Sequence, residues 1–227
     1  NKIRQKYSDI VISNSKKVKQ EYGENKMPAK VEVNYLPWGE ILKLGDTMTT
    51  PKYQAIFQLY TAIAPRRLKD YSEMIFLKGD FDIDELDDEY NYLIVDNDNN
   101  IKSITYNKFK TYKIYGQQVR NVESIPESLN EAIKDFIKSD NLQTGEFLFH
   151  KRNGKKYESF DTLLGNAFGK SDKRISANIL RHAYLTDIYT NRKNLTINMK
   201  KSIAIAMGNC IETQNQYVYY ENDNACD

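Results

Sequence analysis

One arginine of this chain lies where a positive charge is costly. Arg181 and His182 sit between the apolar pairs Ile179–Leu180 and Ala183–Tyr184. An unpaired buried cation is expensive, so an arginine in such a place usually meets an anion. That anion is either a carboxylate of the protein or a phosphate of a ligand. The phosphate interpretation requires further groups suited to phosphate elsewhere in the chain.

A second arginine site lies in the basic run of residues 66–69. Asp70 follows Arg67 by three residues. On a helical turn this spacing lets the carboxylate orient the guanidinium. Taken alone, the pattern is equally that of a surface arginine with a local ion pair.

Two further segments carry polar groups in a suggestive order. Lys110 lies in a predicted turn of a strand region, and Asn178 shares a helix face with Arg181. The last segment runs from Gly208-Asn209 to Tyr217. A lysine in a turn is usually solvated, and tyrosine is abundant here, with 17 in the chain. Each segment is therefore weak by itself, and the order of all four carries the argument.

In this order and spacing, the four segments resemble the catalytic domain of the tyrosine recombinases, also called phage-type integrases. The resemblance covers roughly residues 38–220. Its most specific parts are the triplet Leu180-Arg181-His182 and the pair Thr213-Gln214 before Tyr217. It implies double-stranded DNA as the substrate, with no cofactor and no metal.

The resemblance also implies a role for each residue. Tyr217 would attack a DNA phosphodiester and form a 3′-phosphotyrosyl link, which conserves the bond energy. Arg67 and Arg181 would clamp the charge that develops on the non-bridging oxygens. Lys110 would protonate the leaving 5′-oxygen as the general acid. Asp70 would support Arg67.

Two positions depart from the family pattern. Asn178 stands where the family usually has His or Lys, and Asn209 stands where it usually has His or Trp. An amide donates a hydrogen bond to a phosphate oxygen but does not move a proton near pH 7. His182 is expected to be structural, because as the helix neighbour of Arg181 it points about 100° away.

The identity of the nucleophile stays open at this stage. The interval from Asn209 to Tyr217 is shorter than the family's usual spacing, which makes Tyr219 and Tyr220 rival nucleophiles. Tyr217 is the favoured one. Three functions are compatible with the sequence: an active recombinase or integrase, a DNA-binding relative with impaired catalysis, and a type IB topoisomerase. Without the resemblance, what remains is an α+β domain with basic patches.

The distribution of charge along the chain favours a DNA partner more than the net charge does. The net charge is only +2. Acidic residues are concentrated in residues 80–89, and the remainder of the chain is basic. We expect a tetramer on DNA, with a monomer possible for the free chain. The expected DNA contacts are Arg66, Lys69, Lys108, Lys173 and Arg174.

The hydrophobic pattern predicts an α+β fold that is mainly helical, with a small antiparallel β-sheet. The predicted strands are residues 92–95, 101–106 and 111–119, and the predicted helices are residues 160–168, 176–190 and 198–207, with two more beginning at Pro51 and after Pro126. Residues 1–35 are polar and lysine-rich, and we interpret them as a linker or the tail of a missing N-terminal DNA-binding domain. Residues 36–227 would form the catalytic domain. The start without Met fits such a fragment.

Several classes of protein are disfavoured by composition. No apolar run approaches the ~20 residues of a membrane span, and the first residues lack a signal peptide's apolar region. Cys210 and Cys226 are too few for a disulfide framework, which predicts a reducing, intracellular compartment. The bias toward Lys, Asn, Ile and Tyr is typical of an AT-rich genome, such as that of a virus or mobile element.

Overall fold

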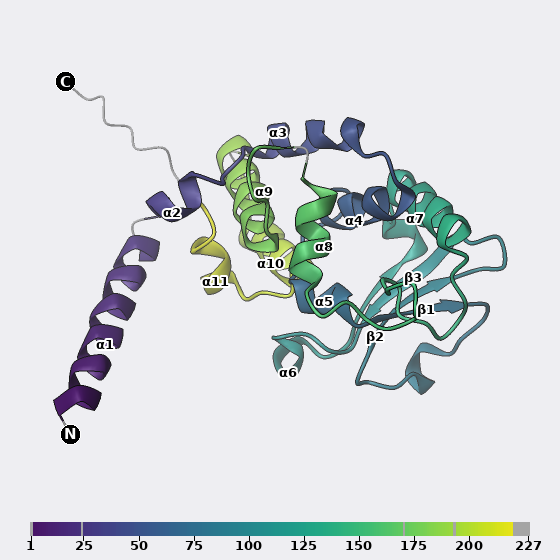
Figure 1. Cartoon of the computed structure of the whole chain (residues 1–227), viewed down its shortest axis with the longest axis horizontal. Helices are drawn as coiled ribbons and strands as arrows, with labels where there is room; N and C mark the ends of the chain where they lie inside the picture. The colour runs from purple at the N-terminus through teal and green to yellow at the C-terminus, as the bar shows by residue number, and fades with distance from the viewer. Residues whose placement is uncertain (1, 24, 170, 193, 220–227) are drawn as a thin grey trace.

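The computed structural model describes residues 2–23, 25–169, 171–192 and 194–219, and these form helices around a small sheet (Figure 1). The helices are α1 (Lys2–Gly23), α2 (Ala29–Glu32), α3 (Trp38–Lys43), α4 (Pro51–Thr61), α5 (Leu68–Ser72), α6 (Tyr112–Tyr115), α7 (Glu127–Asp140), α8 (Phe160–Ala167), α9 (Ala177–Asn191), α10 (Ile197–Ala206) and α11 (Ile211–Asn215). The short 3-10 helices are η1 (Leu44–Thr47), η2 (Ile83–Glu85) and η3 (Val122–Ser124). The strands are β1 (Met74–Lys78), β2 (Asn91–Val95), β3 (Ile101–Tyr106) and β4 (Gln118–Asn121). The predicted α+β class, mainly helical, is confirmed.

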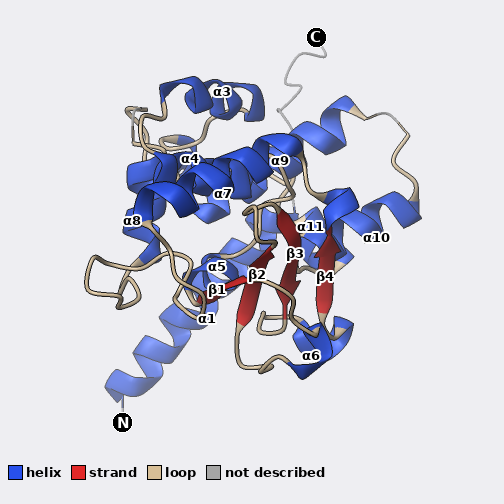
Figure 2. Ribbon diagram, turned by 90° about the vertical axis from the view of Figure 1, so that its right-hand side faces the viewer, coloured by secondary structure: helices blue, strands red, loops and turns tan. Residues whose placement is uncertain are grey.

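The sheet is mixed, so the predicted small antiparallel sheet is corrected at one strand pair. Its strand order is β1-β2-β3-β4, with β1 parallel to β2 and the other pairs antiparallel (Figure 2). The predicted hairpin of β2 and β3 is confirmed. The Asp96 carboxylate closes its turn by accepting from the backbone N–H groups of Asp98 and Asn100, both at a distance of 2.8 Å. The sequence analysis missed β1, whose parallel pairing needs a crossover through residues 79–90.

The predicted third strand, residues 111–119, is wrong over most of its length. Residues 112–115 form the helical turn α6, and the strand begins only at Gln118. The turn brings Tyr112 and Tyr115 against the main core, which an extended chain with alternating faces does not do. Gly116, with φ of 65°, then reverses the chain into β4.

The main core lies between the sheet and the helices α4, α7 and α8. The predicted apolar face of α7 is buried: Leu129, Ile133, Phe136 and Ile137. The predicted start of α4 is confirmed, because the Thr50 side chain accepts from the backbone N–H of Tyr53 and Pro51 occupies the first turn. Every residue of β2 is buried, since the connection through η2 covers the second face of the sheet.

A second, smaller core lies between α9, α10 and the C-terminal segment. Its buried residues are Ala64, Leu185, Met207 and Val218. The chain passes from the main core to this second core just after α4, where residues 64–67 lie. The boundary between the two cores therefore brings together segments that are far apart in sequence.

The described residues before α3 contain two helices, α1 and α2. Helix α1 projects away from the rest of the molecule (Figure 1). The side-chain amide of Asn25 donates to the carbonyl oxygens of Asn215 and Val218, each at a distance of 2.7 Å. The segment after α1 therefore contacts the C-terminal segment. Within the described residues, no helix combines the length and apolarity that crossing a membrane requires.

A buried asparagine joins three elements next to the sheet. Asn91, at the start of β2, donates to the carbonyl oxygens of Asp70 (2.9 Å) and Lys108 (3.1 Å). Its side-chain oxygen accepts from the backbone N–H groups of Asn107 (2.9 Å) and Lys108 (2.8 Å). One side chain thereby fixes α5 against the segment that follows β3.

We expect Asn91→Ala to lower the free energy of unfolding by about 3 kcal/mol or more, because buried backbone groups lose their partners at about 1–3 kcal/mol each. Asn97→Ala, at an exposed residue of the hairpin turn, is the matched control and should change stability by less than about 0.5 kcal/mol. Urea unfolding measures both. Equal effects of the two substitutions would contradict the role of Asn91.

Candidate active site

A pocket of about 680 Å³ opens where α5, the segment after β3, the start of α9 and Tyr217 meet. Its lining residues are Arg67, Leu68, Lys69, Asp70, Glu73, Lys108, Phe109, Lys110, Ala177, Asn178, Arg181 and Tyr217. The structure thus brings together five of the six predicted catalytic residues, and the sixth, Asn209, contacts Arg67.

Three arginines converge on the C-terminal end of α10. They donate from Nη1 to three consecutive carbonyl oxygens: Arg66 to Ala206 (2.9 Å), Arg181 to Met207 (3.0 Å) and Arg67 to Gly208 (2.5 Å). The last carbonyls of a helix have no partner within it and carry the negative end of its dipole. The end of α10 therefore stabilises and orients three positive charges at once.

Arg181 is buried without an opposite charge bonded to it. Its side chain is 1% exposed, and Nη1 also donates to the carbonyl oxygen of Pro65 over 3.1 Å. In the described part of the chain no carboxylate forms an ion pair with it, and its Nε and Nη2 have no hydrogen-bond partner. Burial lowers the pKa of Arg181, and Tyr217, whose ring centroid lies 4.9 Å from the guanidinium carbon, opposes that shift. Among the described residues, Asp70 is the carboxylate that raises the pKa of Arg181, but it forms its ion pair with Arg66.

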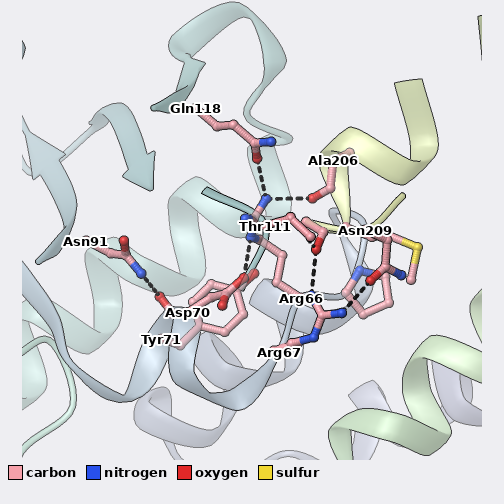
Figure 3. Close-up of polar contacts among 12 residues, drawn as sticks. Arg66, Arg67, Asp70, Tyr71, Asn91, Thr111, Gln118, Ala206 and Asn209 are labelled. Carbon is pink, nitrogen blue, oxygen red and sulfur yellow. Dashed lines mark hydrogen bonds and ion pairs between the residues drawn. The ribbon is translucent and has the colours of Figure 1, made fainter. Parts of the chain in front are cut away.

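Arg66, a predicted DNA contact, is buried in the structure. The side chain is 2% exposed and lies between the rings of Tyr106 and Phe109, at 3.8 and 4.9 Å from their centroids. Its Nε donates to Asp70 over 2.8 Å, and Nη1 also donates to Gln118 over 2.8 Å (Figure 3). Arg66 is an internal cation behind the pocket.

Asp70 supports Arg66 instead of the predicted Arg67. Arg67 is the residue before α5 and has extended backbone angles, φ −76° and ψ 156°, so the helical spacing of three residues does not bring the two side chains together. Burial raises the pKa of Asp70, and Arg66 opposes that shift. Arg67 is held by Gly208 and by the side-chain oxygen of Asn209, at 2.7 Å from Nη2.

The structure gives Asn209 a different contact from the predicted one. Its side chain is 0% exposed, and its oxygen accepts from Arg67. The amide nitrogen is buried and has no partner in the described ranges. In this arrangement Asn209 orients Arg67, whereas the sequence predicted direct donation to a phosphate oxygen.

Exposed polar groups form the rim of the pocket. Lys110 and Asn178 are exposed, and Asn178 lies in the first turn of α9. The Ser176 side chain accepts from the backbone N–H of Ile179 and so caps the N-terminus of α9. The positive end of the α9 dipole therefore lies at the pocket that Lys110 also lines, and it favours an anion.

The other predicted DNA contacts divide into two groups. Lys69 and Lys108 are exposed on the pocket lining, and Lys108 forms an ion pair with Glu89 over 2.8 Å. Lys173 donates to the carbonyl oxygen of Tyr35 at a distance of 2.7 Å. The exposed Arg174 forms an ion pair with Asp161 at a distance of 3.0 Å. These last two lie on the segment before α9 and not in the pocket.

His182 points away from the pocket and into the C-terminal segment. Its side chain is 2% exposed, with Nδ1 at 2.8 Å from the carbonyl oxygen of Tyr217 and Nε2 at 3.2 Å from the hydroxyl of Tyr219. Burial lowers the pKa of His182 to about 4. Tyr219 is buried outside the pocket, and the third candidate nucleophile, Tyr220, lies outside the described residues.

Sequence analysis missed several residues that support the site. Asn91 fixes the segment before Lys110, and the Thr111 hydroxyl donates to the same Gly208 carbonyl as Arg67, over 3.0 Å. Gln118 accepts from Arg66 across the sheet. None of these residues forms a local pattern, because each meets its partner only through the fold. No cluster of potential metal ligands occurs among the residues that the structure describes.

Comparison with known proteins identifies the class of fold. The chain has an α+β fold like that of a tyrosine recombinase. The solved structure of XerA recombinase matches it with a TM-score of 0.52 and 13% identity, over 83% of this chain and 59% of that chain. The chain thus spans less than two thirds of that recombinase. No protein-family model matches, and no curated protein matches in sequence.

Gly208→Ala should destabilise the site. Gly208 has φ of 62°, and a Cβ there would lie 2.8 Å from Nη2 of Arg66. Gly154, with φ of 75° and open space around a Cβ, is the matched control. Both alanines cost about 1–2 kcal/mol for the left-handed backbone. Gly208→Ala should cost about 1–3 kcal/mol more in urea unfolding, because Arg66 must shift from its buried partners. Equal costs would show that the contact is unimportant.

Stability should depend on His182 between pH 6.5 and 4. The folded pKa of about 4 lies below the ordinary value of 6.5, so the unfolded chain takes up the proton first as pH falls. The stabilisation is complete above pH 6.5, and about 3 kcal/mol of it is lost by pH 4. His182→Gln should lose less stability over this range than the unaltered chain, and His150→Gln should lose as much. Urea unfolding at both pH values measures the difference, and parallel curves for all three proteins would contradict it.

Proposed function

We propose that this chain is a site-specific DNA recombinase or integrase that cuts and rejoins double-stranded DNA through a 3′-phosphotyrosyl intermediate. The observation that carries the proposal is the buried charge of Arg181, which has no bonded carboxylate and lies against Tyr217. Arg67 and Lys110 line the same pocket. A phosphodiester supplies the missing anion, and Tyr217 supplies a nucleophile next to it.

The arrangement suits attack at phosphorus. Arg67 and Arg181 are held by backbone carbonyls, so they meet the charge of the transition state without reorganising. The Tyr217 ring covers Arg181, so a phosphate reaches that guanidinium when the ring turns outward. As the Tyr217 oxygen bonds to phosphorus, its proton passes to solvent. The bond from phosphorus to the 5′-oxygen breaks, and Lys110 gives that oxygen its proton.

The second candidate function is a DNA-binding relative with impaired catalysis, and the two asparagines favour it. Neither Asn178 nor Asn209 moves a proton near pH 7. Asn209 nevertheless orients Arg67, because its side-chain oxygen accepts from Nη2 of Arg67 at 2.7 Å. Catalysis by the arginines, Lys110 and Tyr217 is therefore the preferred proposal. Assembly as a tetramer on DNA belongs to the same proposal.

The trapping of a covalent adduct tests the nucleophile. We expect the protein to form a denaturation-resistant adduct with nicked duplexes built from the ends of its parent element, and Tyr217→Phe to abolish it. Tyr7→Phe, at an exposed position of α1, is the control and should form the adduct at the parental rate. Tight binding without an adduct would favour the DNA-binding relative. Relaxation of supercoiled DNA at no specific site would indicate a type IB topoisomerase.

The role of Lys110 is tested with a modified leaving group. Lys110→Ala should slow adduct formation by about 100- to 10,000-fold, the usual range for general acid catalysis. A substrate with sulfur in place of the 5′-oxygen has a leaving group that needs no proton, so it should restore the rate of Lys110→Ala. Arg181→Gln should lose about 100- to 1000-fold and should not be restored. Equal restoration of both variants would contradict the assignment.

A further inference from the structure

The imidazole of His182 contacts the residues on both sides of Val218. Nδ1 lies 2.8 Å from the carbonyl oxygen of Tyr217, and Nε2 lies 3.2 Å from the hydroxyl of Tyr219. The rings of His182 and Tyr219 are stacked, with centroids 4.4 Å apart and planes inclined by 5°. One buried side chain thus engages the candidate nucleophile's backbone and the neighbouring tyrosine.

The two contacts together define the state of the imidazole. A carbonyl oxygen only accepts, so Nδ1 must carry the proton that is donated to Tyr217. Nε2 of the neutral ring is then an acceptor, and the Tyr219 hydroxyl donates to it. The Tyr217 carbonyl therefore selects the Nδ1–H tautomer, and the Tyr219 hydroxyl stabilises this tautomer by donating to Nε2.

The same helix holds this segment at further points. The Thr186 hydroxyl oxygen, one turn after His182 on α9, accepts from the backbone N–H of Tyr219 over 3.0 Å. Val218 is 1% exposed and packs in the second core. Because α9 also carries Arg181, the nucleophile's backbone and the phosphate-binding guanidinium have one common support.

We propose that His182 and Tyr219 are positioning residues, which hold the backbone of Tyr217 at a fixed place relative to Arg181. The proposal rests on the proposed function and gives Tyr219 a role other than nucleophile. Placement matters because a shift of about 1 Å at a reacting group can cost about 100-fold in rate. Both polar contacts of the His182 ring fall on the segment that carries Tyr217, as a positioning role requires.

Two substitutions at His182 separate positioning from packing. The amide nitrogen of Asn lies where Nδ1 lies in His, so His182→Asn keeps a donor for the Tyr217 carbonyl, whereas His182→Gln places its amide near Nε2. At saturating DNA we expect adduct formation to slow by about tenfold or less in His182→Asn and by about 100-fold in His182→Gln. The affinity for DNA should stay unchanged in both. His150→Gln, at the chain's other histidine, should keep the parental rate.

Tyr219→Phe keeps the stacked ring and removes only the hydroxyl. NMR of the imidazole carbons and nitrogens should show the Nδ1–H tautomer for His182 in the parent protein and a mixture in Tyr219→Phe, with His150→Gln assigning the signals. The rate of adduct formation should fall together with the share of the Nδ1–H form.

The outcomes are distinguishable from failure of the proposed function. An Nε2–H tautomer in the parent, or equal adduct rates in His182→Asn, His182→Gln and Tyr219→Phe, would overturn the positioning role while the adduct itself stands. No adduct from the parent protein would overturn the proposed function and the positioning role with it. Weaker DNA binding at an unchanged rate would also overturn the positioning role.

Discussion

The hydrogen bonds of three guanidinium groups to one turn of backbone determine the geometry of the candidate site. Ala206, Met207 and Gly208 supply the carbonyl oxygens, at the end of α10 where helix carbonyls have no partners of their own. The positive charges gather there although they repel one another, because the helix end is negative and Asp70 neutralises one of them. Arg67 and Arg181 thus have no bonded carboxylate among the described residues, and the proposed function rests on this unbalanced charge.

The sheet contributes to the site from behind. The rings of Tyr106 and Phe109 enclose Arg66, and Asn91 fixes the segment between β3 and Lys110. The small core around Met207 and Val218 then fixes the end of α10 against α9. The site lies at the boundary of two cores, so its parts come from segments that are separated in sequence but rigidly packed.

The sequence was informative where the signal is local. The Thr50 cap, the apolar face of α7 and the hairpin around Asp96 follow from patterns within a few residues, and the structure confirms them. The sequence pattern misled or was silent where a residue or strand pairs with a partner that the local pattern does not reveal. The spacing paired Asp70 with Arg67, but the extended backbone at Arg67 leaves Asp70 to Arg66. Strand β1 was missed because parallel pairing leaves no turn signal next to it.

Main-chain support has a consequence for how such a site changes during evolution. A carbonyl oxygen is the same in every residue type, so positions 206 and 207 can exchange their side chains and still hold Arg66 and Arg181 in place. Constraint on these contacts leaves no residue signature for a sequence search to recognise. The chain shares its fold with XerA recombinase at 13% identity, and that identity carries no information on the bonds that orient the arginines.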